Sequence, residues 1–260
     1  MAKRLWLSGF WDEKTKDWST MWPQVRTLFP SDILAHQNQW GGYDVSKAIE
    51  HLETDWFRQG ICSIDLETLD WYLNDIDNHG RMHPAVIDRW VMLISAVKTQ
   101  RPDGRWGYFG GAPIQGLGFY DGSNSLEATA RYNEAVQPIA AASDYLMIIL
   151  YPRSTDTLER SLWAIRESVN AAKAYGKPLI GWLWPGWMDV LNSFGDARWQ
   201  QRDFWTPERI QAQMIEPKYF RALLDGYYAN GVEEIVLYSE GYIPMEDQTW
   251  IDEAQEWLKV

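Results

Sequence analysis

The longest apolar run of the chain is YLMIILY, from Tyr145 to Tyr151. Its length and composition predict a buried strand. Asp156 and Glu159 follow it as a capping-box pair, and Gly176 is the stop signal of a helix. Between these signals apolar residues recur at helical spacing: Leu158, Leu162, Ile165, Val169 and Ala172. A further apolar run from Leu179 to Trp184 then completes a strand–helix–strand unit.

The same alternation extends along the chain. Further strands are predicted at Leu5 to Phe10, Ile33 to Gln37, Ile61 to Glu67, Arg105 to Phe109, and Glu234 to Ser239. Further helices are predicted at Asp44 to Gln59, His83 to Thr99, Ser125 to Ala140, Pro217 to Asn230, and Thr249 to Leu258. Seven apolar strands alternating with helices favour an α/β fold, a TIM-like (β/α) barrel of parallel strands in one domain, residues 1–260. The alternative is a doubly wound open sheet, but no Gly-x-Gly-x-x-Gly supports it.

Composition excludes several classes of function. The 36 acidic and 24 basic residues give a net charge of −12 and a pI near 4.8, which argues against binding to nucleic acid. The longest apolar run is far shorter than the roughly 20 residues that cross a membrane, so no membrane partner is expected. A single cysteine, Cys62, allows neither an intrachain disulfide nor a cysteine metal cluster.

The N-terminus MAKRLWLSGFW has two positive charges followed by a short apolar stretch. It lacks the small-residue cleavage site of a signal peptide, so we interpret it as a first strand. The protein is therefore expected to be cytoplasmic, or released by a route that needs no signal.

Tryptophan is unusually frequent, with 17 residues in the chain. Its flat apolar ring suits core packing and also stacking on a sugar ring or a base. Nine tryptophans lie at strand ends or in strand-to-helix connections: Trp11, Trp18, Trp22, Trp40, Trp71, Trp184, Trp187, Trp199 and Trp205. In a parallel barrel these connections meet on the active-site face, and three of them are unusually long, at residues 11–32, 110–122 and 185–216. These positions favour ligand stacking, although Trp182 and Trp184 on one strand face fit core packing equally well.

Two acids end the predicted strand at residues 60–67. Side chains alternate along a strand, so Asp65 and Glu67 point to the same side. Two carboxylates held close at low dielectric cannot both ionise freely, and one becomes the proton donor that glycosidic cleavage needs. Glu67, longer and nearer the rim, is the candidate acid, and Asp65 is the candidate modulator. Glu240, after the last predicted strand, is either a nucleophile opposite Glu67 or an ordinary polar rim residue.

Other chemical signals are weaker. His79 and His83 lie near Asp75 and Asp77, but nothing in their spacing fixes a tetrahedral metal site. The sequence contains no phosphate loop and no serine in a nucleophile elbow. We therefore expect no metal site and no cofactor.

Several motifs in series resemble the hyaluronidase-type glycoside hydrolases. That family carries Asp-Trp-Glu at the end of a barrel strand, where this chain has Asp65-Leu66-Glu67. The other similar segments are Gly41-Gly42-Tyr43, Ala48 to Leu52, Arg101 to Phe109, and Leu150-Tyr151-Pro152. Their order holds from about Trp40 to Tyr238, which is most of the chain. The resemblance implies a single catalytic domain with a distorted barrel.

The resemblance also implies a retaining mechanism in which the N-acetyl carbonyl of the substrate attacks the anomeric carbon. Glu67 would donate the proton and later activate water, Asp65 would orient the acetamido group, and Tyr151 would hydrogen-bond to that group. The expected substrate is an oligo- or polysaccharide that contains N-acetylhexosamine. The residues expected to bind it are Trp40, Trp106, Tyr108, Phe109, Trp184, Trp187, Tyr238 and Glu240.

The chain departs from the family in features that bear on the substrate. The family's disulfides cannot form with one cysteine, and the tryptophan of the family's last strand is replaced here by Tyr238. The net charge of −12 suits a polyanionic glycan poorly, so a less charged N-acetylhexosamine glycan is as good a candidate as hyaluronan. Two alternatives stay open: a muramidase-like lysozyme barrel, which also ends a strand with Asp-x-Glu, and a non-catalytic sugar-binding barrel.

Overall fold

The computed structural model describes residues 3–8, 25–27, 33–34, 61–64, 84–109, 133–187, 189, 206–238 and 249–259. The strands in these ranges are β1 (Arg4–Ser8), β2 (Val25–Thr27), β3 (Ile33–Leu34), β4 (Ile61–Ile64), β5 (Arg105–Tyr108), β6 (Leu146–Leu150), β7 (Leu179–Leu183) and β8 (Glu234–Tyr238). The helices are α3 (Pro84–Gln100), α6 (Gln137–Ala142), α7 (Leu158–Lys173), α9 (Pro207–Gln213), α10 (Pro217–Ala229) and α12 (Thr249–Lys259). None of these helices is long and apolar enough to cross a membrane.

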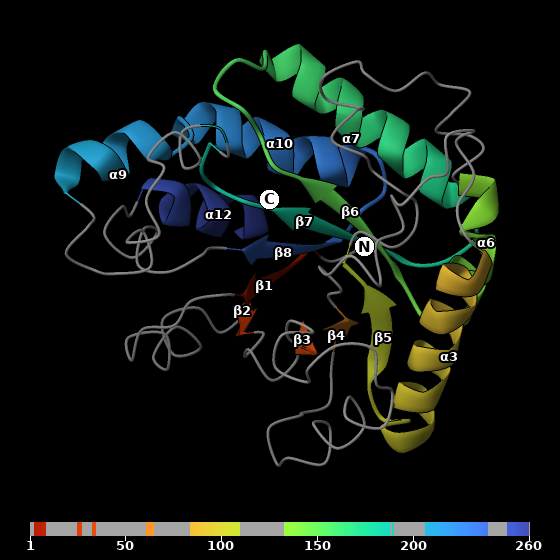
Figure 1. Cartoon of the computed structure of the whole chain (residues 1–260). Helices are drawn as coiled ribbons and strands as arrows, with labels where there is room; N and C mark the ends of the chain where they lie inside the picture. Colours follow the sequence, from red (N-terminus) through yellow and green to blue (C-terminus); the bar gives the residue numbers. More distant parts are fainter. Residues whose placement is uncertain are drawn as a thin grey trace. The chain divides into compact units, whose positions relative to one another are not determined.

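The strands form two sheets, in the orders β2-β1-β8-β7-β6 and β3-β4-β5 (Figure 1). Every strand pair whose register is described is parallel. The alternation of strand and helix from β4 onward therefore agrees with the α/β class predicted from the sequence.

The chain divides into two compact, interleaved units. Unit 1 contains Met1–Phe29, Ile149–Val169 and Ile180–Val260, and unit 2 contains Pro30–Ile148 and Asn170–Leu179. β1, β2, β8, α9, α10 and α12 thus belong to unit 1, whereas β3, β4, β5, α3 and α6 belong to unit 2. The chain passes from one unit to the other within β6, α7 and β7.

Two glycines allow close packing in unit 1. A Cβ added at Gly181 of β7 would lie 3.0 Å from the Tyr227 ring of α10. A Cβ added at Gly226 of α10 would lie 2.5 Å from Leu162 Cδ2 of α7. The Tyr227 hydroxyl also donates a hydrogen bond to the Trp182 carbonyl oxygen at 3.1 Å. α10 therefore packs directly on β7 through one glycine and against α7 through the other.

β1 is joined to β8 and α12 in unit 1. It pairs with β8 along its full length, with Arg4 opposite Glu234. The Glu234 carboxylate accepts the Trp6 indole N–H at 3.2 Å and forms an ion pair with Arg4 at 3.2 Å. Lys3 Nζ donates to the Trp257 carbonyl oxygen at 3.0 Å and lies 4.8 Å from the centroid of the Trp257 ring.

In unit 2 the three-stranded sheet packs on α3. The Tyr108 hydroxyl of β5 donates to the Trp90 carbonyl oxygen of α3 at 2.6 Å, and the two ring centroids are 4.4 Å apart. Lys98 near the end of α3 donates to Asp144 Oδ1 at 2.5 Å, and Asp144 Oδ2 accepts the Trp106 backbone N–H at 2.9 Å. The helix is thus bound to the sheet by apolar contact and by a shared carboxylate.

The structure contains the seven predicted strands and adds two elements inside connections that we expected to be loops. β2 lies within residues 11–32, and three residues are too few for a strand pattern to be recognised in the sequence. α9 lies within residues 185–216. Thr206 Oγ1 accepts the Arg209 backbone N–H at 3.4 Å, and Pro207 occupies the first helical position. Thr206 and Pro207 form a helix start signal that is recognisable in the sequence itself.

Candidate functional site

Three aromatic side chains meet at the carboxyl ends of neighbouring strands in unit 1. Tyr151 directly follows β6, Trp184 directly follows β7, and Tyr238 is the last residue of β8. The Tyr151 and Trp184 ring centroids are 5.7 Å apart, and the Trp184 and Tyr238 centroids are 6.0 Å apart. Both contacts are edge-to-face, at 80° and 85°, which is a favoured geometry for aromatic pairs. We call these three residues the aromatic cluster.

The strand register explains why the cluster shares one face of the sheet. Gly181 of β7 is in register with Ile235 of β8, and a Cβ on Gly181 would face the Tyr227 ring of α10. Side chains alternate along each strand, so Trp182 and Trp184 lie on the opposite face, away from α10. Trp182 contacts Tyr238 there, at a centroid distance of 5.0 Å.

The cluster has a buried base and an accessible edge. Trp182 and Trp184 are 3% and 1% exposed, whereas Tyr151 and Tyr238 are partly exposed. The Trp184 indole N–H is buried and has no hydrogen-bond partner among the residues that the structure describes. Tyr151 and Tyr238 are therefore the accessible members of the cluster, and their rings and phenol hydroxyls suit contact with a sugar ring. Of the two explanations for Trp182 and Trp184, the burial of both side chains agrees with core packing.

The segment after Trp184 is held by backbone pairing with the end of α9. Gly186 forms an antiparallel bridge with Met214, and the Trp187 N–H donates to the Gln213 carbonyl oxygen at 2.7 Å. Gln213 is fully buried, and its Nε2 donates to the Trp187 carbonyl oxygen at 2.8 Å. A Cβ at Gly186 would lie 2.9 Å from Gln213 Nε2 and 3.0 Å from Trp184 Nε1. Glycine at this position therefore lets the segment pack against the cluster.

Trp187 packs on the helix layer of unit 1. Its ring lies edge-on to Tyr219 of α10, with a centroid distance of 5.1 Å and an angle of 77°. Tyr219 is a hydrogen-bond partner of Ser161 at 2.8 Å and donates to the Asp156 carbonyl oxygen at 3.3 Å. Burial raises the pKa of Tyr219, which keeps this phenol neutral and suits a structural role. The expected contact of Trp187 with substrate stays a prediction.

Trp106 and Tyr108 of unit 2 belong to the core. They are 0% and 3% exposed, and both point to the side of β5 that α3 covers. The Trp106 indole N–H donates to the Arg101 carbonyl oxygen at 2.9 Å. Burial raises the pKa of Tyr108 well above its usual value. This placement corrects the expectation that the two side chains line a substrate surface, because their polar atoms are bonded to backbone within the core.

Phe109 is the aromatic residue of this segment that stays partly exposed. Its N–H donates to the Ile64 carbonyl oxygen at 2.9 Å, which extends the pairing of β4 with β5 by one residue. Strand alternation places Phe109 on the opposite side from Tyr108, together with Gly107. Gly107 is in register with Ser63 of β4. The predicted role of Phe109 in substrate binding is therefore compatible with its position.

The predicted acid pair lies outside the described residues. β4 ends at Ile64, immediately before Asp65, and Glu67 follows two residues later. Trp40, Glu240 and the possible metal cluster at residues 75–83 are likewise outside the described ranges. Within those ranges, no group of three or more His, Cys, Asp or Glu side chains could hold a metal ion. The roles of Asp65, Glu67, Trp40 and Glu240 stay predictions.

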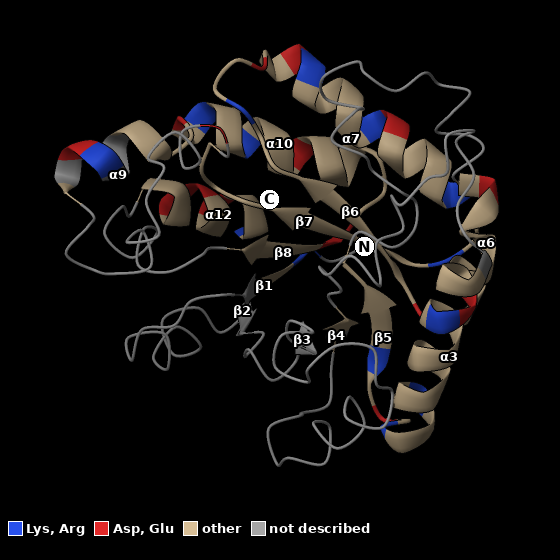
Figure 2. Ribbon diagram, in the orientation of Figure 1, with Lys and Arg blue, Asp and Glu red and all other residues tan. Residues whose placement is uncertain are grey.

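Charged side chains are concentrated on the helices of unit 1, and β6 and β7 carry none (Figure 2).

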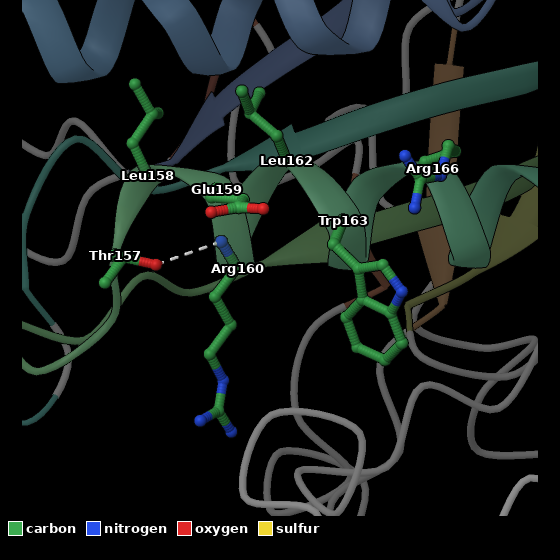
Figure 3. A pocket seen from close by; sticks show the side chains of 7 residues that line it. All are labelled: Thr157, Leu158, Glu159, Arg160, Leu162, Trp163 and Arg166. Atoms are coloured by element: carbon green, nitrogen blue, oxygen red, sulfur yellow. Dashed lines mark hydrogen bonds between the residues drawn. The ribbon is translucent and has the colours of Figure 1, made fainter.

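A pocket of about 670 Å³ lies along the start of α7 and is lined by Thr157, Leu158, Glu159, Arg160, Leu162, Trp163 and Arg166. Arg160 and Trp163 point to one side of the helix, and Leu158 and Leu162 to the other (Figure 3). Arg160 pairs with Asp156 at 3.3 Å and Arg166 with Glu167 at 3.2 Å. These pairs balance the pocket's positive charge, so an anionic ligand gains little attraction there.

The comparisons with known proteins identify solved structures with a similar fold. No family model and no curated protein matches the sequence. Among solved structures, the chain is similar to bee venom hyaluronidase in complex with a hyaluronic acid tetramer, with a TM-score of 0.55 and 15% identity over 85% of this chain and 76% of that one. The monoclinic crystal structure of bee venom hyaluronidase gives a TM-score of 0.56, also at 15% identity, over 85% of this chain and 79% of that one. The chain therefore has the fold class predicted from its sequence, a TIM-like (β/α) barrel.

Proposed function

We propose that the protein is a glycoside hydrolase that cleaves an N-acetylhexosamine-containing polysaccharide, acting as a hyaluronidase-like endo-β-N-acetylhexosaminidase. The observation that carries this proposal is the aromatic cluster of Tyr151, Trp184 and Tyr238. Active sites of (β/α) barrels lie at the carboxyl ends of the strands, where these three residues are found. The fold shared with bee venom hyaluronidase, which was solved with a hyaluronic acid tetramer, supports the same class of activity.

The proposed reaction retains configuration and uses the substrate's acetamido group as the nucleophile. The acetamido carbonyl oxygen bonds to the anomeric carbon as the glycosidic C–O bond breaks, and Glu67 gives its proton to the leaving oxygen. Asp65 orients the acetamido group and stabilises the positive charge that develops on it, while the Tyr151 hydroxyl hydrogen-bonds to that group. Water then attacks the anomeric carbon, the Glu67 carboxylate takes its proton, and the acetamido group is restored.

A substrate of low charge fits this chain best. The net charge of −12 repels a polyanion, and β6 and β7, which lead into the cluster, contribute no basic side chain. The cluster itself offers aromatic faces and phenol hydroxyls, which recognise a neutral sugar as well as an acidic one. We therefore propose a weakly charged N-acetylhexosamine polymer as the substrate.

Glu67→Gln tests the proposal. Purified protein is incubated with a panel of N-acetylhexosamine polymers and with bacterial cell walls, and the products are identified by mass. Removing the general acid should lower turnover by about 10²- to 10⁴-fold while oligosaccharide affinity stays nearly unchanged. The matched control is Glu256→Gln, which alters an exposed carboxylate of α12 that is paired with Lys259 and should leave turnover unchanged. Binding without cleavage across the panel would contradict the hydrolase and favour a sugar-binding barrel, and cleavage of cell walls alone would favour the muramidase.

The identity of the nucleophile has its own test. A thiazoline mimic of the cyclised acetamido intermediate should inhibit the enzyme, and Glu240→Gln should keep substantial activity. A trapped covalent glycosyl-enzyme, or cleavage of sugars that lack the N-acetyl group, would instead make Glu240 the nucleophile and contradict substrate assistance.

A further inference from the structure

One carboxylate ties the loop after β6 to the segment after β7. The Ser154 backbone N–H donates to Asp189 Oδ1 at 2.7 Å, and the Ser154 hydroxyl donates to Asp189 Oδ2 at 2.6 Å. Because both carboxylate oxygens bind a single residue, the contact fixes the orientation of Ser154 as well as its distance. Both residues belong to unit 1, as does the aromatic cluster. We call this pair of hydrogen bonds the Ser154–Asp189 clamp.

Asp189 follows a part of the chain that is itself well anchored. Trp187, two residues earlier, exchanges hydrogen bonds with Gln213 through its N–H and its carbonyl oxygen, at 2.7 and 2.8 Å. The bridge between Gly186 and Met214 adds a further constraint. The clamp therefore holds Ser154 against a backbone segment whose position is fixed by these hydrogen bonds.

The short chain between Ser154 and Tyr151 can transmit this constraint. Pro152 is buried, its ring locks its own φ, and it restricts the preceding Tyr151 to extended conformations. On the other side, the Asp156 N–H donates to the Arg153 carbonyl oxygen at 2.9 Å and closes a turn. Pro152 and this turn therefore restrict the backbone between the clamped residue and Tyr151.

We propose that Asp189 is a positioning residue for Tyr151. By holding Ser154, Asp189 keeps the Tyr151 ring edge-on to Trp184, at 5.7 Å and 80°, and so directs the Tyr151 hydroxyl toward the bound sugar. The kinetic side of this inference rests on the proposed function, in which Tyr151 binds the acetamido group. Loss of the clamp widens the range of Tyr151 orientations without removing any group that touches the substrate.

Hydrogen exchange tests the clamp in the full chain without a substrate. In Asp189→Ala, amide exchange across residues 151–157 should rise about tenfold or more, because the Ser154 N–H loses its acceptor. The matched control is Asp225→Asn, a change in an exposed carboxylate of α10 that pairs with Arg221 at 3.4 Å, and it should leave this segment unchanged. Unaltered exchange in Asp189→Ala overturns the proposal, whether or not the protein acts on any glycan.

A double-mutant cycle tests whether Asp189 acts through Tyr151. Asp189→Ala should lower kcat/KM about 10- to 100-fold, and Asp189→Asn less, because the amide oxygen keeps one acceptor. In a Tyr151→Phe background the same changes should have little further effect, since the hydroxyl they position is gone. Losses that multiply independently would overturn the proposal. A wild-type protein that hydrolyses nothing contradicts the proposed function alone, and the exchange measurement still decides the clamp.

Discussion

Replacing Gly186 by alanine should disturb the aromatic cluster and the fold together. The new Cβ would lie 2.9 Å from Gln213 Nε2, 3.0 Å from Trp184 Nε1 and 3.2 Å from the Gln213 carbonyl oxygen. Trp184 and Gln213 are 1% and 0% exposed, so neither side chain can move into solvent without unpacking. Gly186 is not among the positive-φ glycines of the described chain, so alanine causes no backbone strain there. The whole effect is therefore steric.

Overpacking of a buried site costs about 1–3 kcal/mol of unfolding free energy. For a chain of this size each kcal/mol lowers Tm by roughly 2–4 °C, so Gly186→Ala should lower Tm by about 2–12 °C. Displacement of the Trp184 ring should also reduce kcat/KM by about tenfold, because small displacements of the residues that position a substrate lower the reaction rate.

Thermal unfolding and steady-state kinetics of the same preparation provide the assay. The control is Gly176→Ala, in the turn after α7, where φ is 66° and no atom lies within 4 Å of the added Cβ. Backbone strain should cost that variant about 1 kcal/mol and leave kcat/KM unchanged. A Gly186→Ala protein with wild-type Tm and kcat/KM would refute the packing described around Trp184. A loss of stability without a kinetic effect would separate Trp184 from the active site.

Two other substitutions test the fold and its pH dependence. Gly107→Ala should lower the unfolding free energy by about 3 kcal/mol or more, which is a larger loss than for Gly186→Ala. The reason is that its Cβ would lie 2.7 Å from the buried Tyr145 ring and 2.9 Å from the Tyr145 carbonyl oxygen. A wild-type urea midpoint for Gly107→Ala would show that β5 and Tyr145 are not packed in this way. Burial raises the pKa of Tyr175 from 10 to about 12, so the stability from its neutral phenol is complete below pH 10 and is lost as the pH rises toward 12. The urea midpoint should therefore fall less for Tyr175→Phe than for wild type between pH 10 and 12, and equal declines would exclude this residue as the cause.

Local signals along the chain were enough to predict the strand–helix–strand unit at residues 145–184. β6, α7 and β7 lie within the predicted limits because apolar runs and the turn at Gly176 mark their ends. The N-terminal cap of α7 is a feature that the local sequence does not determine. Thr157 Oγ1 accepts the Arg160 N–H at 3.2 Å, whereas Asp156, the predicted cap, pairs with the Arg160 guanidinium at 3.3 Å. Both side chains are suitable caps, so the sequence indicated the boundary and not the partner.

The aromatic cluster was predictable as a set of residues and not as a geometry. Strand ends and a family resemblance point to Tyr151, Trp184 and Tyr238, and the structure brings the three into contact, while their roles toward a substrate stay predictions. The same reasoning failed for Trp106 and Tyr108, because a motif does not say which face of the strand α3 covers. That face depends on packing between elements far apart in the sequence.

The clamp residues could not have been found in advance. Ser154 and Asp189 are 35 positions apart, and neither lies in a recognisable motif. Only the three-dimensional course of two connections brings them together. Gln213 is similar, because nothing in its sequence neighbourhood marks it as fully buried.

The pairing of β1 with β8 has a consequence for biosynthesis. Arg4 lies opposite Glu234 in this pairing. The edge of β1 that pairs with β8 therefore has no partner until residues 234–238 have been translated. Until then the only other neighbour that the described sheet offers β1 is the three-residue β2, and an apolar strand edge stays open to other chains. Such long-range closure is slow, and slow closure exposes nascent chains to aggregation. Yield in recombinant expression should therefore be governed by translation speed and chaperone supply as much as by the stability of the finished molecule.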